Sequence, residues 1–366
     1  MLDGDLMVME AKIALEDGTI LKGEGFGHET TNAGEVVFAT GMSGYTESLT
    51  DPSFKGDILM STYPLEGNHG VISRWYQSDK IQVEGFIVRE VCKNVSNFSS
   101  KKTLDEFLKE FQVPGISGID TRDLTIKLRE VGSMRGVIST ENLDDDELIA
   151  TARRHPHITD IDLVPKVSTK KIKNFGEDFN RKIAIIDCGV KKNIINSFLE
   201  RETGVILFPY DTDYKEITDY NPDGLMVSSG PGNPDRVSET IATVQKIANR
   251  LPLFGICMGQ QLIAKSFGAK SYKMKFGHRG ANQPVKDLNT GKVFMTSQNH
   301  GFTIDKESLD NTDLKLNYIN LNDGTSEGIA HKELYLNCIQ FHPEAGPGPN
   351  DTRFMFDDFI EMMDKY

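Results

Sequence analysis

The stretch Pro252-Leu-Phe-Gly-Ile-Cys-Met-Gly-Gln-Gln261 decides the fold of the second half of this chain. An apolar run, Leu251–Ile256, leads into Gly-x-Cys-x-Gly, and a helical pattern begins directly after it. The glycines at 255 and 259 permit a tight turn from strand to helix, which exposes the side chain of Cys257 at the strand end. The pattern therefore predicts the cysteine form of a nucleophile elbow.

This position gives Cys257 a defined chemistry. A thiol at a helix N-terminus feels the positive end of the helix dipole, which favours the thiolate that attacks carbonyl carbon. The backbone N–H of Met258, the next residue, would face the oxyanion that develops during such an attack. The alternative is a buried structural cysteine between two packing glycines, and this motif alone does not decide between them.

The rest of the second half alternates short apolar strands with helices. We expect strands at 183–188, 205–208, 224–227 and 251–256, and helices near 191–200, 239–250, 258–267 and from Asp351. Such alternation predicts an α/β fold, with a mostly parallel sheet that carries helices on both faces. Ligands of these sheets bind at the carboxyl ends of the strands, where Cys257 is expected.

Two further motifs follow predicted strands. In His342-Pro-Glu344, the proline keeps His342 extended, so the side chains at 342 and 344 point the same way. His342 can then act as a base toward a cysteine, with Glu344 holding its ring. The second motif, Ser228-Ser-Gly-Pro-Gly-Asn-Pro234, forms a rigid turn that could supply a second oxyanion donor. Seen alone, His-Pro-Glu could be a common surface turn, and the second motif would be read as a plain strand-terminating loop.

The first half is expected to be a mixed α+β domain. A hairpin is predicted over residues 11–25, with strands at 35–39 and 57–62 and helices at 121–131 and 144–154. Another helix begins after Thr103, which forms a capping box with Glu106. Prolines and polar residues then suggest a connection, so we place the N-terminal domain at 1–155, a linker at 156–181 and the C-terminal domain at 182–366.

Composition excludes several classes of function. The 366 residues carry 41 Lys+Arg against 54 Asp+Glu, a net charge of −13, which argues against binding nucleic acid through its backbone. No apolar run is long enough to cross a membrane, and the acidic start Met-Leu-Asp-Gly-Asp-Leu is unlike a signal peptide. Four scattered cysteines fit neither a disulfide framework nor a zinc site, so we expect a cytoplasmic protein and assign Cys92, Cys188 and Cys338 to packing.

Taken in order, the Gly-Pro-Gly, Gly-Ile-Cys-x-Gly and His-Pro-Glu motifs resemble those of the class I (triad) glutamine amidotransferases. The first half narrows the resemblance, because residues 38–53 (FATGMSGYTESLTDPS) are similar to the amino-terminal domain of the small-subunit family of carbamoyl phosphate synthetases. Further stretches resemble the same family: GIDTRDLT from Gly118, MRGVI from Met134, FGHRGAN from Phe276, QNHGF from Gln298 and HPEAGPGP from His342.

The resemblance implies roles for individual residues. Cys257, His342 and Glu344 match the catalytic triad. The positions that match contacts to glutamine are Ser53, Gly230, Gly232, Met258, Gln261, Asn299, Gly301 and Phe302. Two positions depart from the family pattern: Met258 stands where leucine is usual, and Gln260 stands where histidine is frequent. Because Met258 should act through its backbone, its change matters little, whereas the effect of Gln260 stays open.

The implied activity is hydrolysis of L-glutamine, with the ammonia passed to a large synthetase subunit that uses bicarbonate and ATP. ATP and a divalent metal are expected on that subunit, and neither a cofactor nor a metal on this chain, which has no G-x-x-x-x-G-K-[ST] loop. Two alternatives remain: a non-catalytic docking subunit that supports ammonia-dependent synthesis, and an amidotransferase of another synthase. The resemblance implies a heterodimer and leaves open whether the product serves pyrimidine or arginine biosynthesis.

Overall fold

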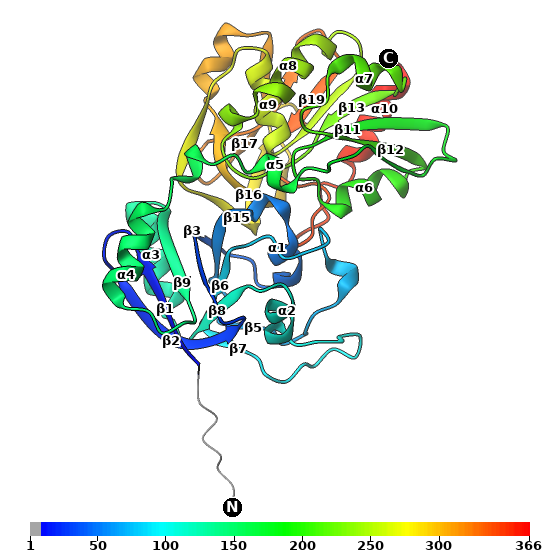
Figure 1. Ribbon diagram of the computed structural model, residues 1–366. Coiled ribbons are helices and arrows are strands. Elements are labelled where there is room, and N and C mark those ends of the chain that lie inside the picture. Colours follow the sequence, from blue (N-terminus) through cyan, green and yellow to red (C-terminus); the bar gives the residue numbers. More distant parts are fainter. Residues whose placement is uncertain (1–8) are drawn as a thin grey trace, which may run out of the picture. The chain divides into compact units, whose positions relative to one another are not determined.

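The computed structural model describes residues 9–366, which form two compact units (Figure 1). The first unit contains the described residues up to Thr50 together with Gly56–Ile158. The second contains Thr159–Tyr366 and, in addition, the short segment Asp51–Lys55. The acidic start on which the signal-peptide argument rests lies outside the described residues.

The first unit is built on a closed barrel of seven strands in the order β1-β2-β8-β6-β4-β3-β9. Its strands are β1 (Glu10–Leu15), β2 (Ile20–Gly27), β3 (Thr31–Ala39), β4 (Asp57–Ser61), β6 (Gly85–Ile87), β8 (Pro114–Ser117) and β9 (Met134–Ser139). A separate two-stranded ribbon pairs β5 (Leu65–Glu66) with β7 (Glu90–Val91). The predicted hairpin over 11–25 is confirmed as the antiparallel pair β1–β2, but closure of the barrel was not anticipated.

Four helices belong to the first unit. They are α1 (Tyr45–Thr50), α2 (Leu104–Glu110), α3 (Thr121–Val131) and α4 (Asp145–Arg154), with the short 3₁₀ turn η2 (Ser73–Trp75). The predicted capping box of α2 is confirmed, since the Thr103 hydroxyl accepts from the Glu106 N–H and the Glu106 carboxylate accepts from the Thr103 N–H. Helix α4 packs Leu148 and Ala152 onto the barrel. These helices and strands make the N-terminal half the expected mixture of α and β.

The second unit contains a ten-stranded sheet in the order β10-β12-β11-β13-β14-β19-β18-β17-β15-β16. The strands are β10 (Lys173–Phe175), β11 (Arg181–Asp187), β12 (Thr203–Pro209), β13 (Gly224–Val227), β14 (Leu253–Ile256), β15 (Ser271–Asp287), β16 (Val293–Ile304), β17 (Leu314–Asn320), β18 (Ser326–His331) and β19 (Leu336–Ile339). From β12 to β19 neighbouring strands run parallel, as predicted. The antiparallel extension from β18 to β16 was not predicted.

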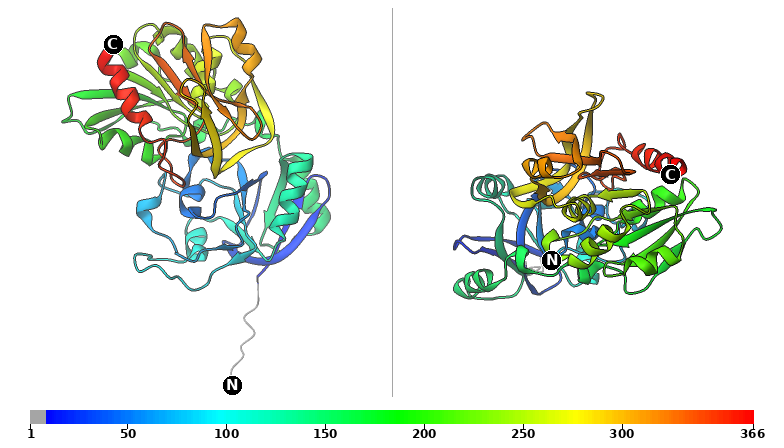
Figure 2. Two further views of the ribbon diagram at one scale, coloured as in Figure 1. Left: turned by 180° about the vertical axis from the view of Figure 1, so that it is seen from behind. Right: turned by 90° about the horizontal axis from the view of Figure 1, so that it is seen from above.

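Helices cover both faces of the parallel part of this sheet (Figure 2). Their bounds are α5 (Val164–Val167), α6 (Lys192–Leu199), α7 (Tyr214–Asp219), α8 (Ser238–Ile247), α9 (Met258–Ser266) and α10 (Met355–Lys365), with the 3₁₀ turns η1 (Pro52–Phe54), η3 (Ile158–Asp160), η4 (Pro234–Arg236) and η5 (Lys306–Asn311). One core joins the sheet to α5, α7, α8 and α9, and the other joins it to α6 and α10. This confirms the predicted α/β architecture.

The structure corrects two expectations. Most of the predicted linker 156–181 belongs to the second unit, because Leu163 and Val164 are buried there and β10 pairs with β12. Proline and polar residues made this segment look like a connection, but its few apolar side chains anchor it. Cys92, expected in the core, is half-buried and its thiol donates to the Asn94 carbonyl.

Across residues 9–366, no helix has the length and apolar character needed to cross a bilayer.

Candidate active site

Cys257 lies at the turn between β14 and α9, with φ +55° and ψ −109°. A positive φ is strained for a residue with a side chain, and such strain characterises the nucleophile elbow. The turn depends on its two glycines: a Cβ at Gly255 would lie 2.7 Å from the Gly259 carbonyl carbon, and one at Gly259 only 1.9 Å from the Val227 oxygen. The side chain of Cys257 is therefore held at the carboxyl end of the parallel sheet, as the sequence predicts.

His342 and Glu344 form a buried pair after β19, which is the neighbour of β14 in the sheet. His342 Nδ1 lies 2.7 Å from Glu344 Oε1, and the His342 N–H donates to the Ser297 carbonyl at 2.8 Å, which fixes the backbone. The remaining ring nitrogen, Nε2, is buried and makes no hydrogen bond of normal geometry within residues 9–366. Nδ1 of His342 is thus paired with a carboxylate, and Nε2 is left available to exchange a proton with a reacting group.

The electrostatics of this pair favour a charged histidine. Burial alone would lower the pKa of His342, but the negative charge of Glu344 and the interaction with the Cys257 thiol raise it. Burial would raise the pKa of Glu344, yet the positive charges of Lys191 and His342 lower it. The Glu344 carboxylate therefore stabilises the charged form of the His342 ring beside the buried Cys257 thiol.

Lys191 is a charged residue of this site that was not predicted from the sequence. Its Nζ atom lies 3.1 Å from Glu344 Oε1 and donates to the Ala345 carbonyl at 2.6 Å, with only 1% of the residue exposed. The residue follows β11, so it comes from a third parallel strand that ends at the same edge of the sheet. A lysine in the loop after an apolar strand is the one sequence signal that could have indicated this position.

The Gly-Pro-Gly loop follows β13 and packs closely on the strand beside it. A Cβ at Gly230 would lie 2.3 Å from the Cys188 oxygen, and Gly232 has φ +83°, a conformation that favours glycine. The loop therefore accepts only small residues at these two positions. Met258 is buried and its side chain belongs to the core, which agrees with the expectation that it acts through its backbone.

The other residues expected to contact glutamine lie on β16, α9 and η1. The backbone carbonyls of Asn299 and Phe302 contact the elbow. The Asn299 carbonyl oxygen accepts from Cys257 Sγ at 3.6 Å, and the Phe302 carbonyl oxygen accepts from Gln261 Nε2 at 2.8 Å. Ser53 Oγ is buried and lacks a hydrogen-bond partner within residues 9–366. Asn299 Nδ2 also donates to Asp51 Oδ2 at 3.3 Å, and Gly301 lies between Asn299 and Phe302 on β16.

Gln260 is fully buried beside these residues. Its Nε2 lies 3.4 Å from Gln340 Oε1, which also accepts from Gln261 Nε2 at 3.0 Å. The two glutamines of α9 therefore share one acceptor on the segment that leads to His342. Gln260 thus contributes to the joint between the elbow helix and that segment, without reaching the thiol through any described contact.

A cysteine on a strained elbow, a buried His–Glu pair and a glycine-rich loop at neighbouring strand ends have the chemistry of a cysteine-dependent acyl-transfer site. The model of the family "Glutamine amidotransferase class-I" matches residues 184–362, and that of "Carbamoyl-phosphate synthase small chain, CPSase domain" matches residues 13–138. The chain belongs to the family of carbamoyl phosphate synthase small chains.

Similarity to curated relatives extends over almost the whole chain. The carbamoyl phosphate synthase small chain of Archaeoglobus fulgidus is 50% identical over 98% of this chain and 100% of its own length. That of Methanocaldococcus jannaschii is 52% identical over the same shares of the two chains. Among solved structures, one named for a GMP synthase subunit of Thermoplasma acidophilum covers 51% of this chain and 95% of its own, with 25% identity and a TM-score of 0.44.

Proposed function

We propose that this chain hydrolyses L-glutamine and passes the ammonia to a large synthetase subunit that makes carbamoyl phosphate. The observation that carries the proposal is the buried set of Cys257, His342 and Glu344 at the edge of the parallel sheet. Membership of the small-chain family supports the choice of synthase. The partner then is a large subunit in a heterodimer, located in the cytoplasm, and it binds the ATP and divalent metal.

The first half-reaction forms a thioester. Cys257 Sγ attacks the side-chain amide carbon of glutamine, and His342 holds the proton that the thiol gives up. The backbone N–H groups of Met258 and the Gly230–Gly232 loop stabilise the oxyanion of the tetrahedral intermediate. His342 then gives its proton to the departing nitrogen, which leaves as ammonia, and the γ-glutamyl group stays on sulfur.

The second half-reaction regenerates the thiol. A water molecule attacks the thioester carbon while His342 takes its proton, and the C–S bond breaks to release glutamate. Glu344 keeps the ring oriented in both steps and stabilises its charged form. The side-chain oxygens of Gln261 and Ser53 are suited to the α-amino group of the substrate, and N–H groups near Gly301 to its carboxylate.

The substitution Cys257→Ser tests this proposal directly. In the complex with the large subunit, we expect glutamine-dependent carbamoyl phosphate synthesis to fall by about 1,000-fold or more, because a neutral hydroxyl is a far weaker nucleophile. Ammonia-dependent synthesis should persist. Cys92→Ser, at a half-buried thiol of the first unit, is the matched control and should leave both activities unchanged.

The same measurement separates the alternatives. A non-catalytic docking subunit would show no glutamine-dependent activity to lose, and both variants would support ammonia-dependent synthesis equally. An amidotransferase of another synthase would hydrolyse glutamine but would not stimulate carbamoyl phosphate formation by the large subunit. Glutaminase activity of the purified chain, with and without that subunit, distinguishes these outcomes.

A further inference from the structure

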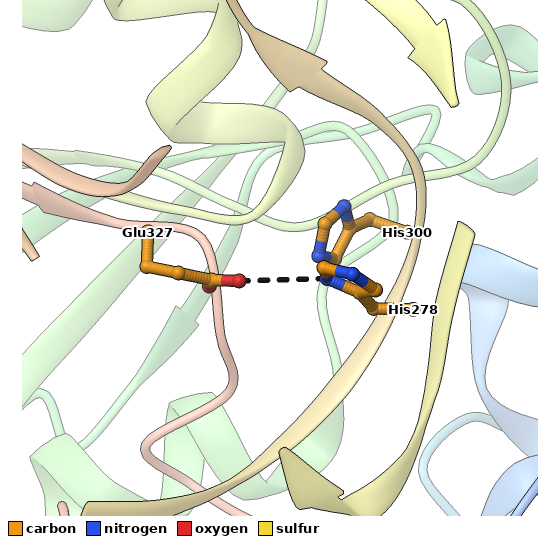
Figure 3. Close-up of side chains that lie close together, drawn as sticks. All are labelled: His278, His300 and Glu327. Atoms are coloured by element: carbon orange, nitrogen blue, oxygen red, sulfur yellow. Dashed lines mark ion pairs between the residues drawn. The ribbon is translucent and has the colours of Figure 1, made fainter. Parts of the chain in front are cut away.

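A second buried group of ionisable side chains lies on the antiparallel extension of the sheet, and the mechanism above does not use it. His278 on β15 pairs in register with His300 on β16, and Glu327 lies on β18 (Figure 3). The two rings meet edge to face, with centroids 5.1 Å apart and an interplanar angle of 84°. All three residues are at most 5% exposed, so their charges are not screened by solvent.

His278 is held between two carboxylates. Its Nε2 lies 2.9 Å from Asp323 Oδ2, and its Nδ1 lies 3.5 Å from Glu327 Oε1. Asn320 Nδ2 donates to the same Glu327 oxygen at 2.9 Å, and Thr325 donates to the Asp323 carboxylate through its N–H and its hydroxyl. The imidazole ring is therefore fixed in position and in orientation from both nitrogens.

These contacts determine which ring carries a charge. Burial alone would lower the pKa of His278, but its bonds to Asp323 and Glu327 raise it to about 9. The pKa of His300 is lowered by burial and by the neighbouring charges of His278, Arg279 and His342. At neutral pH the pair is thus one charged ring, His278, against one neutral ring, His300.

The neutral ring connects this group to the segment expected to contact glutamine. Because a carbonyl only accepts, His300 Nδ1 carries a hydrogen and donates it to the Phe302 oxygen at 2.7 Å. The same oxygen accepts from Gln261 of the elbow helix at 2.8 Å. A chain of contacts therefore runs from Asp323 through the two histidines to Phe302 and then to α9, which begins directly after Cys257.

We propose that His278, clamped by Asp323 and Glu327, is a positioning residue that sets the shape of the Asn299–Phe302 segment for glutamine binding. It acts through His300, whose ring it supports from the side and whose Nδ1–H fixes the Phe302 carbonyl. The inference rests on the proposed function, because it assigns glutamine as the ligand of that segment. It predicts an effect on binding of glutamine rather than on the chemical steps at Cys257.

The same side chains have the chemistry of metal ligands, and their candidate atoms lie within 4.8 Å of one another. We favour the ion-pair network because both nitrogens of His278 lie against carboxylates, His300 Nδ1 donates to the Phe302 carbonyl, and a protonated His278 cannot bind a cation. Metal analysis of the purified chain by mass spectrometry decides between them. Less than 0.1 equivalent of any transition metal supports the network, and one equivalent that is lost in His278→Gln overturns it.

The kinetic test uses Asp323→Asn, which removes one carboxylate at a partly exposed position. We expect the KM for glutamine at pH 7 to rise by about tenfold, with kcat changed less than threefold, because a charge-assisted bond is lost away from the reacting atoms. The matched control Asp313→Asn removes an exposed aspartate that lies 3.9 Å from Lys332, and should leave both constants unchanged. A rise in KM equal to the fall in kcat, or an unchanged KM, would overturn the proposal.

The pH dependence provides a readout that a purely structural role would not give. The charged groups that act on His278 are Asp323 and Glu327, and the ring of His300 packs against it, so its protonation state depends on the clamp. The ratio of KM values, Asp323→Asn over wild type, should collapse toward one above pH 9, where the wild-type ring also loses its charge. A KM ratio that is constant with pH contradicts the proposal. Because the titration of glutamine affects both proteins equally, it cancels in this ratio.

A measurement on the wild-type chain keeps the proposal falsifiable if the variant does not fold. In histidine-labelled protein, one ring resonance should titrate near pH 9 and disappear in His278→Gln; a His278 ring that titrates below pH 7 overturns the proposal. Failure of the proposed function looks different. In that case wild-type protein shows no glutaminase activity that Cys257→Ser removes, whereas failure of this inference leaves that activity intact and the KM of Asp323→Asn normal.

Discussion

The Nζ atom of Lys191 lies 3.1 Å from Oε1 of Glu344, and neither side chain is more than 2% exposed. Glu344 also holds Nδ1 of His342, so one carboxylate is shared between the Lys191 side chain and the ring expected to act as base. A buried charge without a partner is costly, because it has lost its hydration and gained nothing in exchange. Removing any one of these three side chains therefore leaves the others less stable.

Removing the buried cation should weaken the fold. In Lys191→Met, Glu344 loses its ion-pair partner while remaining excluded from water, and we expect the free energy of unfolding to fall by about 3 kcal/mol. Urea denaturation measures it. Lys192→Met, at the exposed neighbouring position, is the control and should change stability by less than about 0.5 kcal/mol. Equal effects of the two substitutions would contradict a specific role for the buried pair.

Neutralising the carboxylate should reduce catalysis. Glu344→Gln keeps the shape of the side chain but removes the charge that raises the pKa of His342, so we expect kcat for glutamine hydrolysis to fall by about 100-fold. Steady-state glutaminase assays measure it, with the exposed Glu333→Gln as control. Ammonia-dependent synthesis should not change. If kcat of Glu344→Gln stays within threefold of wild type, His342 does not depend on the Glu344 charge for catalysis.

The elbow should not tolerate a larger residue at Gly259. A Cβ there would lie 1.9 Å from the Val227 oxygen, so Gly259→Ala must displace either the helix or the neighbouring strand. We expect a loss of at least about 3 kcal/mol in unfolding free energy and no detectable glutaminase activity. Gly41→Ala, where the nearest atom would be 3.4 Å away, should be near neutral. Thermal unfolding that is unchanged in Gly259→Ala would show that the elbow is looser than these distances indicate.

A buried carboxyl in the first unit should make stability depend on pH. Burial raises the pKa of Glu66 from 4.5 to about 7 in the folded protein. Between these values the folded state binds a proton that the unfolded state has lost, so stability falls as the pH rises from 4.5 to 7 and levels off above it. Glu66→Gln should remove this slope and stabilise the protein by up to about 3 kcal/mol at pH 8. Urea denaturation at pH values from 5 to 8 measures this slope. If the unfolding free energy of Glu66→Gln falls with pH as steeply as that of wild type, Glu66 is not responsible.

The parts of this site that could be predicted from the sequence are those in which a local pattern carries the geometry. The glycines around Cys257 force the elbow, and the proline after His342 forces the extended turn to Glu344. These constraints act within a few residues. The same locality explains the confirmed capping box at Thr103 and the hairpin β1–β2.

What could not be predicted depends on contacts between distant segments. Lys191 reaches Glu344 across 153 positions of sequence, and nothing in the local composition around either residue indicates the pair. The antiparallel strands β15 to β18 have irregular registers with bulges, so alternation of polar and apolar residues is weak there. The clamp on His278 was missed for this reason, since its partners come from the turn after β17 and from β18.

The segment Asp51–Lys55 groups with the second unit although the chain on both sides of it belongs to the first. A truncated chain that starts at Thr159 would therefore lack one of the second unit's own loops, including Ser53 and the partner that Asp51 offers to Asn299. Dissection of this protein into separately expressed halves has to supply that pentapeptide in trans or graft it. For the same reason, recombination between relatives that exchanges only residues 1–158 also exchanges a piece of the glutaminase half.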